Sequence, residues 1–266
     1  MPYSLIWLPE ILKNAGLKVA PVDGWEDRGR GDMGNILGII CHHTATPDKG
    51  NMPTLHTLIH GRSDLPGPLA QLGLGRDGTF YIVAAGRCNH AGKGVWQGLV
   101  NGNTNFIGIE AENTGGSADY PWPKVQMEAY QRGVAAILKH SGRSHDFCAG
   151  HKEYARPLHR KNDPSFDMVS FRDEVASIMN GQAPAPQLIP SVEPNVQPGV
   201  AVARPTLRRG SKGEFVKQAQ TKLGITADGD FGPNMEAAVR SFQREQGLVP
   251  DGIIGPRSWM LLDKKN

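Results

Sequence analysis

The chain has 266 residues, of which 39% are hydrophobic and 21% are charged. This composition excludes a disordered or fibrous chain and is typical of one or two globular domains. The net charge of +3 is too small to indicate nucleic-acid binding, and no apolar run is long enough to suggest membrane insertion.

The N-terminal segment predicts a short helix and not a signal peptide. It lacks a basic start, and Glu10, Lys13 and Asn14 interrupt its apolar residues. The three cysteines are widely spaced, without a CxxC pair, and do not suggest a disulfide framework. We therefore expect a monomer made in a reducing cytoplasm. Action outside it would then require release by another agent.

Short apolar runs alternate with helix-period segments in the first 180 residues. The run ILGIIC at 36–41 and the run FIGIEA at 106–111 predict buried strands. Two shorter runs flank the RDG turn at 76–78 and predict a hairpin. Apolar residues at helical spacing predict helices over 124–140 and 166–179. Strands mixed with helices predict an α/β domain, with the strand order left open.

The composition changes at residues 181–205, where six prolines and little charge predict an extended spacer. We therefore divide the chain into a domain at 1–180, a linker at 181–205 and a domain at 206–266. The last part has apolar residues at helical spacing and the related motifs DGDFGP and DGIIGP, which predict a three-helix unit. It holds ten Lys and Arg against seven Asp and Glu, which suits weak attraction to an anionic polymer.

Two strand ends carry residues suited to metal chemistry. A catalytic zinc site needs about three protein ligands and an open position for water. His42 and His43 follow the first buried run, and alternation along a strand allows only one of them to face a given site. Glu110 lies inside an apolar run, where burial would raise its pKa and suit acid–base work. The alternative for the strand-end histidine is a structural role, and the alternative for Glu110 is a buried ion pair.

A third cluster follows in the segment GHKEYA and the nearby RKNDP. It places His151, Lys161 and Asp163 within thirteen residues. Imidazole and carboxylate ligands suit zinc, and a lysine could stabilise negative charge, although a solvated loop has the same composition. Other patterns are weaker. His56 and His60 have the spacing of HExxH without its glutamate, and a pairing of Cys88 with the nearby histidine lacks an orienting group.

Four motifs together resemble the type-2 N-acetylmuramoyl-L-alanine amidases: HHTAT after a buried strand, NHAG, IGIE, and GH followed by RK-x-DP. The resemblance covers about residues 30–180 and implies a mixed central sheet flanked by helices. It also implies specific roles: zinc ligands at His42, His151 and Asp163, a catalytic carboxylate at Glu110, a catalytic lysine at Lys161, and a histidine lining the substrate groove at His90.

The chain departs from that family in three places. The spacing from His151 to Asp163 is about two residues longer than in the muropeptide amidases. Asn89 stands where a Trp is common, and LAQ at 69–71 stands where many relatives have an aromatic residue or histidine. These departures concern substrate fit more than metal binding.

The C-terminal part resembles the type 1 peptidoglycan-binding domain through LRRGSKGEFVKQAQTKLG, AVRSFQREQGL and the two DG-x-x-GP motifs, with Met235 in place of the usual Thr. Both resemblances together imply a phage endolysin-like enzyme. It would hydrolyse the amide between N-acetylmuramic acid and L-alanine in bacterial peptidoglycan, with Zn²⁺ as cofactor. The alternatives are a host autolysin, a muropeptide-recycling amidase, a non-catalytic recognition protein, and another wall hydrolase such as a metallo-endopeptidase.

Overall fold

A computed structural model describes residues 2–47, 50–119, 121–182, 204–246, 248, 250 and 252–264. The chain forms two compact units, Met1–Leu188 and Ile189–Asn266. Most of the predicted linker lies outside the described residues, so its extended conformation and the proposed boundaries at 180 and 205 stay predictions.

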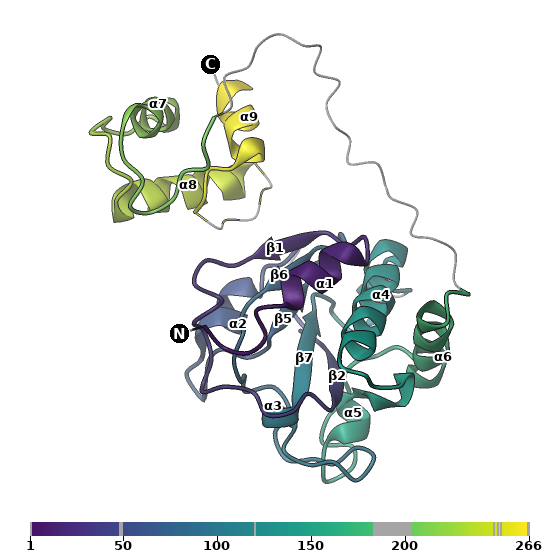
Figure 1. Cartoon of the computed structure of the whole chain (residues 1–266). Coiled ribbons are helices and arrows are strands. Elements are labelled where there is room, and N and C mark those ends of the chain that lie inside the picture. The colour runs from purple at the N-terminus through teal and green to yellow at the C-terminus, as the bar shows by residue number, and fades with distance from the viewer. Residues whose placement is uncertain are drawn as a thin grey trace. The chain divides into compact units, whose positions relative to one another are not determined.

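The first unit is an α/β domain built on a six-stranded mixed sheet in the order β1-β6-β5-β7-β2-β8 (Figure 1). β5 and β6 pair antiparallel, and the other neighbours run parallel. A two-stranded sheet pairs β3 with β4. The strands are β1 Val19–Pro21, β2 Gly38–His43, β3 Gly61–Arg62, β4 Leu65–Pro66, β5 Leu72–Leu74, β6 Phe80–Ile82, β7 Phe106–Ala111 and β8 Cys148–Gly150.

Helices cover both faces of this sheet. Three of them, with α4 in the middle, lie side by side on one face and form the main core with it (Figure 1). On the other face, Tyr154 packs against Phe106 of β7. The helices of this unit are α1 Leu8–Asn14, α2 Leu55–His60, α3 Gly102–Asn105, α4 Lys124–His140, α5 His151–Tyr154 and α6 Met168–Met179, with 3₁₀ turns at Ser117–Asp119 and His145–Phe147; α4 lies between α1 and α6.

Side-chain alternation along β2, which lies between β7 and the edge strand β8, separates the core from the candidate site. Ile39 and Cys41 belong to the main core with α4, whereas Ile40 belongs to the small cluster on the opposite face. Because strand side chains alternate, His42 lies on the face opposite α4. β2 is buried along its whole length between β7 and β8, and its residues are apolar up to the last two, His42 and His43.

The second unit has three helices around one core: α7 Glu214–Leu223, α8 Pro233–Glu245 and α9 Pro256–Lys264. The glycines of the two DG motifs make equivalent contacts. Gln220 accepts a hydrogen bond from the Gly229 N–H at 2.8 Å, and Gln243 accepts one from the Gly252 N–H at 2.9 Å. The side-chain amide of each glutamine also donates to the carbonyl oxygen of the residue after that glycine, which is Asp230 or Ile253. The sequence repeat therefore reflects a repeated contact, in which a glutamine side chain of a helix bonds to the backbone of the following DG motif.

The longer predicted elements agree with the structure, whereas some of its short strands were not predicted. β7 and α4 have the predicted bounds, α6 begins two residues late, and the first buried strand is shifted to 38–43. The hairpin forms with shorter strands around the expected turn. β1 and β8 were not predicted, because three residues are too few to show a period.

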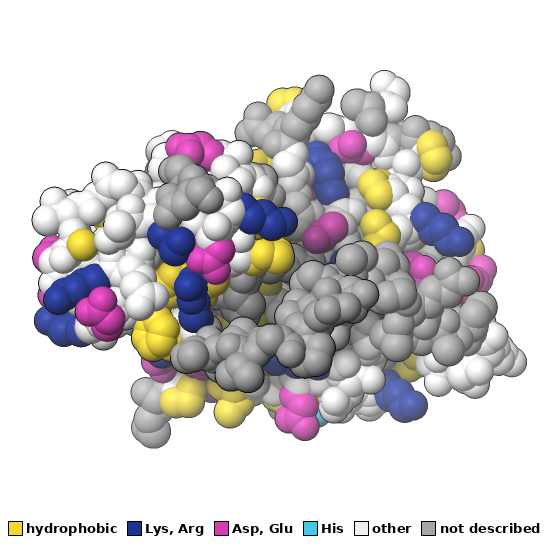
Figure 2. Space-filling view, turned by 90° about the horizontal axis from the view of Figure 1, so that it is seen from above, with side chains coloured by type: hydrophobic (Ala, Val, Ile, Leu, Met, Phe, Trp, Pro, Cys, Tyr) yellow, Lys and Arg dark blue, Asp and Glu magenta, His cyan; other side chains and the backbone are white. Residues whose placement is uncertain are grey.

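Three further features of the described residues concern helix length, cysteines and surface charge. Their helices include none long and apolar enough to span a bilayer. The three cysteines are buried and free, and Cys41 and Cys148 approach to 3.5 Å between their sulfur atoms. On the face seen in Figure 2, the described basic and acidic side chains are interspersed without a broad patch of one sign. This distribution agrees with the small net charge.

Candidate metal centre

The ends of three neighbouring parallel strands bring the predicted site residues together. The register pairs His42 of β2 with Glu110 of β7, and Cys41 with Gly150 of β8. One step further along, His42 therefore lies beside His151, the first residue of α5. Open α/β sheets commonly bind ligands at the carboxyl ends of their strands. Pairing of distant segments, and not their local sequence, creates this cluster.

Three side chains point their ligand atoms at one another in this cluster. The Nδ1 atoms of His42 and His151 are 3.0 Å apart, and each lies 3.1 Å from Asp163 Oδ2. All three residues are buried, with exposed fractions of 1%, 3% and 8%. They form the one potential metal cluster found among the described residues.

This donor set fits a divalent cation such as zinc. In a tetrahedral site with bonds of about 2.0–2.1 Å, ligand atoms lie roughly 3.3 Å apart, close to the separations found here. Two imidazoles and one carboxylate leave a fourth position for water or substrate, as in catalytic zinc sites. His151 Nε2 lies 3.0 Å from the carbonyl oxygen of Ala91, which can only accept. That nitrogen therefore carries the proton, and Nδ1 offers its lone pair.

Burial and mutual contact shift the pKa values of His42 and Asp163. Burial, with repulsion from His151, lowers the pKa of His42 to about 4. Burial acts to raise the pKa of Asp163, but its contacts with His151 and His42 outweigh this effect and hold the pKa well below its ordinary range. These shifts favour a neutral His42 imidazole and a charged Asp163 carboxylate, which are the protonation states that metal ligands require.

Glu110 lies at the edge of the ligand triangle and is not part of it. Its Oε1 atom is 3.9 Å from His42 Nδ1, and its buried Oε2 atom has no hydrogen-bond partner among the described residues. Burial and the nearby Asp163 raise the pKa of Glu110 to about 8. A carboxylate with a raised pKa beside an open ligand position has the properties of a general acid–base group.

The other two predicted residues, Lys161 and His90, differ in their exposure and in their contacts with the cluster. Lys161 is exposed, and its charge acts to lower the pKa values of both Glu110 and His42. His90 is 8% exposed, with Nδ1 3.2 Å from His42 Nε2 and Nε2 3.1 Å from the Phe106 carbonyl oxygen. Its expected contact with substrate stays a prediction, since both ring nitrogens already have protein partners.

The remaining histidine and cysteine patterns lie outside the cluster. His43 accepts a hydrogen bond from the Ser165 N–H and packs near Trp122, away from the ligand atoms. His56 and His60 contact each other on α2. Burial raises the pKa of the Cys88 thiol well above its ordinary value, which opposes the activation that a nucleophilic cysteine needs.

Two polar side chains that sequence reasoning did not single out hold the site in shape. Tyr130 of α4 accepts a hydrogen bond from the His42 N–H at 2.9 Å, and its hydroxyl lies 2.9 Å from the Ile109 carbonyl oxygen. Glu112 is fully buried and accepts from the hydroxyls of Thr44 and Thr54. The sequence around Tyr130 and Glu112 gives no signal that their side chains would bond to segments distant along the chain. Only the apolar surroundings of Glu112 could have drawn attention to it.

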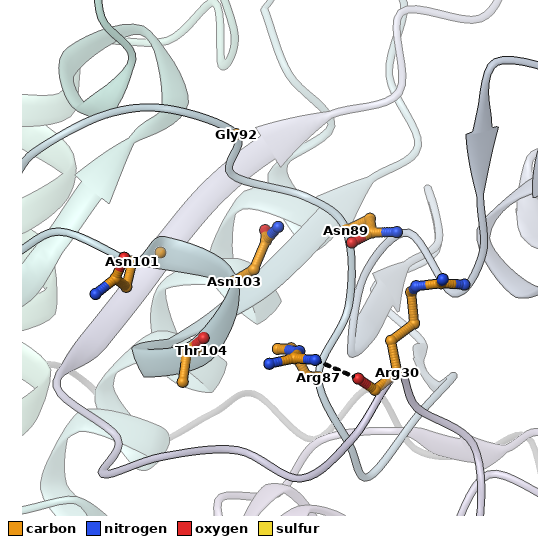
Figure 3. Close-up of a pocket in the computed structure, with 8 residues that line it drawn as sticks. Arg30, Arg87, Asn89, Gly92, Asn101, Asn103 and Thr104 are labelled. Carbon is orange, nitrogen blue, oxygen red and sulfur yellow. Dashed lines mark hydrogen bonds between the residues drawn. The ribbon is translucent and has the colours of Figure 1, made fainter.

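A polar hollow of about 350 Å³ opens beside the segment that carries His90 (Figure 3). Asn103 lines it and also accepts hydrogen bonds from the backbone N–H groups of His90 and Ala91. The wall of the hollow and the support of the metal cluster therefore share one side chain. The residues that line it are Arg30, Arg87, Asn89, Gly92, Asn101, Gly102, Asn103 and Thr104.

Two imidazoles, a carboxylate and a separate glutamate at the edge of a mixed sheet are the arrangement of a candidate mononuclear metallohydrolase. Residues 32–166, half of the chain, match the N-acetylmuramoyl-L-alanine amidase family, and this chain belongs to it. Residues 212–262 match the peptidoglycan-binding domain family. The two matched segments fall one in each compact unit.

Individual relatives match smaller parts of the chain. An uncharacterized protein from the bpoA1 3′ region of Kitasatospora aureofaciens is 42% identical over 72 residues, 24% of this chain and 61% of that protein. The zinc D-Ala-D-Ala carboxypeptidase of Streptomyces albus G is 42% identical over 62 residues, 20% of this chain and 24% of that protein. The chain thus spans less than two thirds of either relative.

Among solved structures, the E. coli N-acetylmuramyl-L-alanine amidase AmiD, in complex with anhydro-N-acetylmuramic acid-L-Ala-D-γ-Glu-L-Lys, is similar at 15% identity. The match covers 89% of this chain and 90% of AmiD with a TM-score of 0.43.

Proposed function

We propose that this chain is a zinc-dependent N-acetylmuramoyl-L-alanine amidase that degrades intact bacterial peptidoglycan, as an endolysin does. The observation that carries the proposal is the convergence of three buried ligand atoms within 3.1 Å of one another in a chain of the amidase family. Beside them lies Glu110, whose buried Oε2 atom has no hydrogen-bond partner among the described residues. The peptidoglycan-binding segment supports the wall polymer as substrate.

In this mechanism His42, His151 and Asp163 would hold the zinc ion. Zinc bound there would polarise the scissile carbonyl and lower the pKa of a water toward about 7. Glu110 would accept the proton of the attacking water and return it to the leaving nitrogen of L-alanine. Lys161 would stabilise the negative charge that develops on the carbonyl oxygen, for which removal of a comparable donor costs about 3 kcal/mol.

The decisive assay uses intact peptidoglycan with and without a chelator. Purified full-length protein should release new L-alanine amino termini, and a zinc chelator should abolish that release. New reducing sugars would indicate a glycosidase, and new D-amino-acid termini would indicate an endopeptidase. Either result would replace the amidase assignment.

Asp163→Asn tests the ligand set with little change in side-chain volume. We expect zinc binding and hydrolysis to be lost, because the amide is a poor ligand in place of a charged carboxylate. The matched control is Asp146→Asn, on an exposed carboxylate outside the cluster, which should retain both. Full activity of Asp163→Asn would refute the assigned zinc site.

A further inference from the structure

The His90 ring lies between the candidate ligand His42 and the backbone of β7. Its Nδ1 atom is 3.2 Å from His42 Nε2, and its Nε2 atom is 3.1 Å from the carbonyl oxygen of Phe106. The two imidazoles meet nearly at right angles, with an interplanar angle of 88°. His42 therefore has one ring nitrogen facing the ligand triangle and the other facing His90.

The two hydrogen bonds that link His42, His90 and the Phe106 carbonyl permit one arrangement of protons on neutral imidazoles. The carbonyl oxygen of Phe106 can only accept, so the Nε2 atom of His90 must carry a proton. A neutral imidazole has a single N–H, so His90 Nδ1 accepts and His42 Nε2 donates to it. The remaining nitrogen of His42, Nδ1, then has no proton. Its lone pair faces His151 Nδ1 and Asp163 Oδ2.

The segment that carries His90 is itself held rigidly. Asn103 Oδ1 accepts hydrogen bonds from the N–H groups of His90 at 3.0 Å and of Ala91 at 2.8 Å. The His90 ring also packs directly on Gly108 of β7, where a Cβ atom would approach His90 Cγ to 2.6 Å. Any other residue at 108 would displace the ring. The same segment orients the second imidazole, because the Ala91 carbonyl oxygen binds His151 Nε2.

We propose that His90 is a positioning residue that sets the tautomer and orientation of His42, so that His42 offers Nδ1 to the metal. The inference rests on the proposed metal site but not on which bond is cleaved. Partners of this kind fix the ring and raise the basicity of a ligating histidine, and their loss typically lowers metal affinity by about 10–100-fold.

Three substitutions separate this role from simple packing. His90→Asn places an acceptor oxygen at the position of Nδ1 and keeps the hydrogen bond from His42. His90→Gln instead reaches the position of Nε2 and keeps the partner at Phe106. His90→Leu removes both. We expect zinc affinity, measured on the full chain by chelator competition, to fall about 10–100-fold for Leu and Gln and to recover most of that loss for Asn.

His56→Leu, at an exposed side chain of α2, is the matched control and should bind zinc with wild-type affinity. Thermal unfolding identifies variants that fail to fold. Equal zinc affinity for His90→Leu and wild type, with affinity lost in Asp163→Asn, would overturn the positioning role and leave the proposed metal site intact. A wild-type protein that binds zinc but releases no L-alanine termini would instead overturn the proposed function alone.

A second readout does not depend on any substitution at position 90. In metal-free wild-type protein, ¹⁵N NMR of the imidazole nitrogens should show His42 and His90 both protonated at Nε2. His42 protonated at Nδ1 would overturn the inference, since no lone pair would then be set toward the other ligands.

Discussion

Glu110 and His42 occupy paired positions on β7 and β2, yet burial moves their pKa values in opposite directions. A low-dielectric surrounding disfavours the charged form of either group. The carboxyl of Glu110 therefore keeps its proton to a higher pH, and the imidazole of His42 loses its proton at a lower pH. At neutral pH the metal-free site favours a neutral His42 and a proton on Glu110.

The raised pKa of Glu110 predicts a pH-dependent stability in the metal-free protein. The unfolded chain ionises this group near its ordinary pKa of 4.5, whereas the native state does so near 8. Between these values the unfolded state binds fewer protons, so the contribution of Glu110 to the free energy of unfolding falls as the pH rises. Its stability contribution is complete below about pH 4.5 and is lost as the pH passes 8.

Glu110→Gln should remove this slope. We expect the stability of the variant relative to wild type to rise by up to about 5 kcal/mol between pH 4.5 and 8, measured by urea unfolding with chelator present. Glu128→Gln, on a more exposed carboxyl paired with Arg132, is the control and should track wild type. A pH-independent difference between Glu110→Gln and wild type would contradict the assigned shift.

At the scale of elements, the contact between α4 and the strand ends helps to hold the neighbouring strands β2 and β7 in register. The Tyr130 hydroxyl from α4 bonds the backbone of His42 and Ile109, one residue from each of the strands β2 and β7. The helix prediction over 124–140 has the bounds that the structure shows. It could not show that the hydroxyl would meet the end of a strand 88 residues away in sequence.

Tyr130→Phe should therefore destabilise the catalytic unit by about 1–3 kcal/mol. The ring stays packed, but the buried N–H of His42 loses its acceptor. Tyr3→Phe, on a partly buried tyrosine packed at the edge of the same core, should change the stability by less than about 0.5 kcal/mol. Thermal and urea unfolding measure both. An unchanged stability of Tyr130→Phe would show that water replaces the lost hydroxyl.

At the scale of the whole molecule, each unit has its own hydrophobic core. One unit contains the match to the amidase family and the other the match to the peptidoglycan-binding family. In the proposed function, the first unit hydrolyses the wall and the second attaches to it. Attachment raises the local concentration of an enzyme at an insoluble polymer without any change in its active site. The second unit should therefore matter for intact wall and not for small soluble fragments.

Deletion of residues 183–266 tests this division of labour. On intact peptidoglycan we expect the initial rate to fall about tenfold or more, because the tether is lost. On a soluble muropeptide the rate should stay within about twofold of the full chain. If the truncated chain were as fast as the full chain on both substrates, the protein would be a fragment-recycling enzyme. If the truncated chain lost activity on both, the second unit would support the fold of the first.

The sequence by itself predicted a two-part organisation and the longest elements, because periodicity over ten or more residues and a proline-rich segment are local signals. The two compact units and the bounds of β7 and α4 agree with it, and the linker stays a prediction. Family motifs also indicated His42, His151 and Asp163 as ligands. Tertiary structure alone decided how these residues meet, since Glu110, His42 and His151 become neighbours only through the parallel register of β7, β2 and β8. It also placed both ring nitrogens of His90 against protein partners, which no spacing along the chain could reveal. Hydrogen-bond partners distant in sequence are set by packing, and packing is a property of the folded molecule.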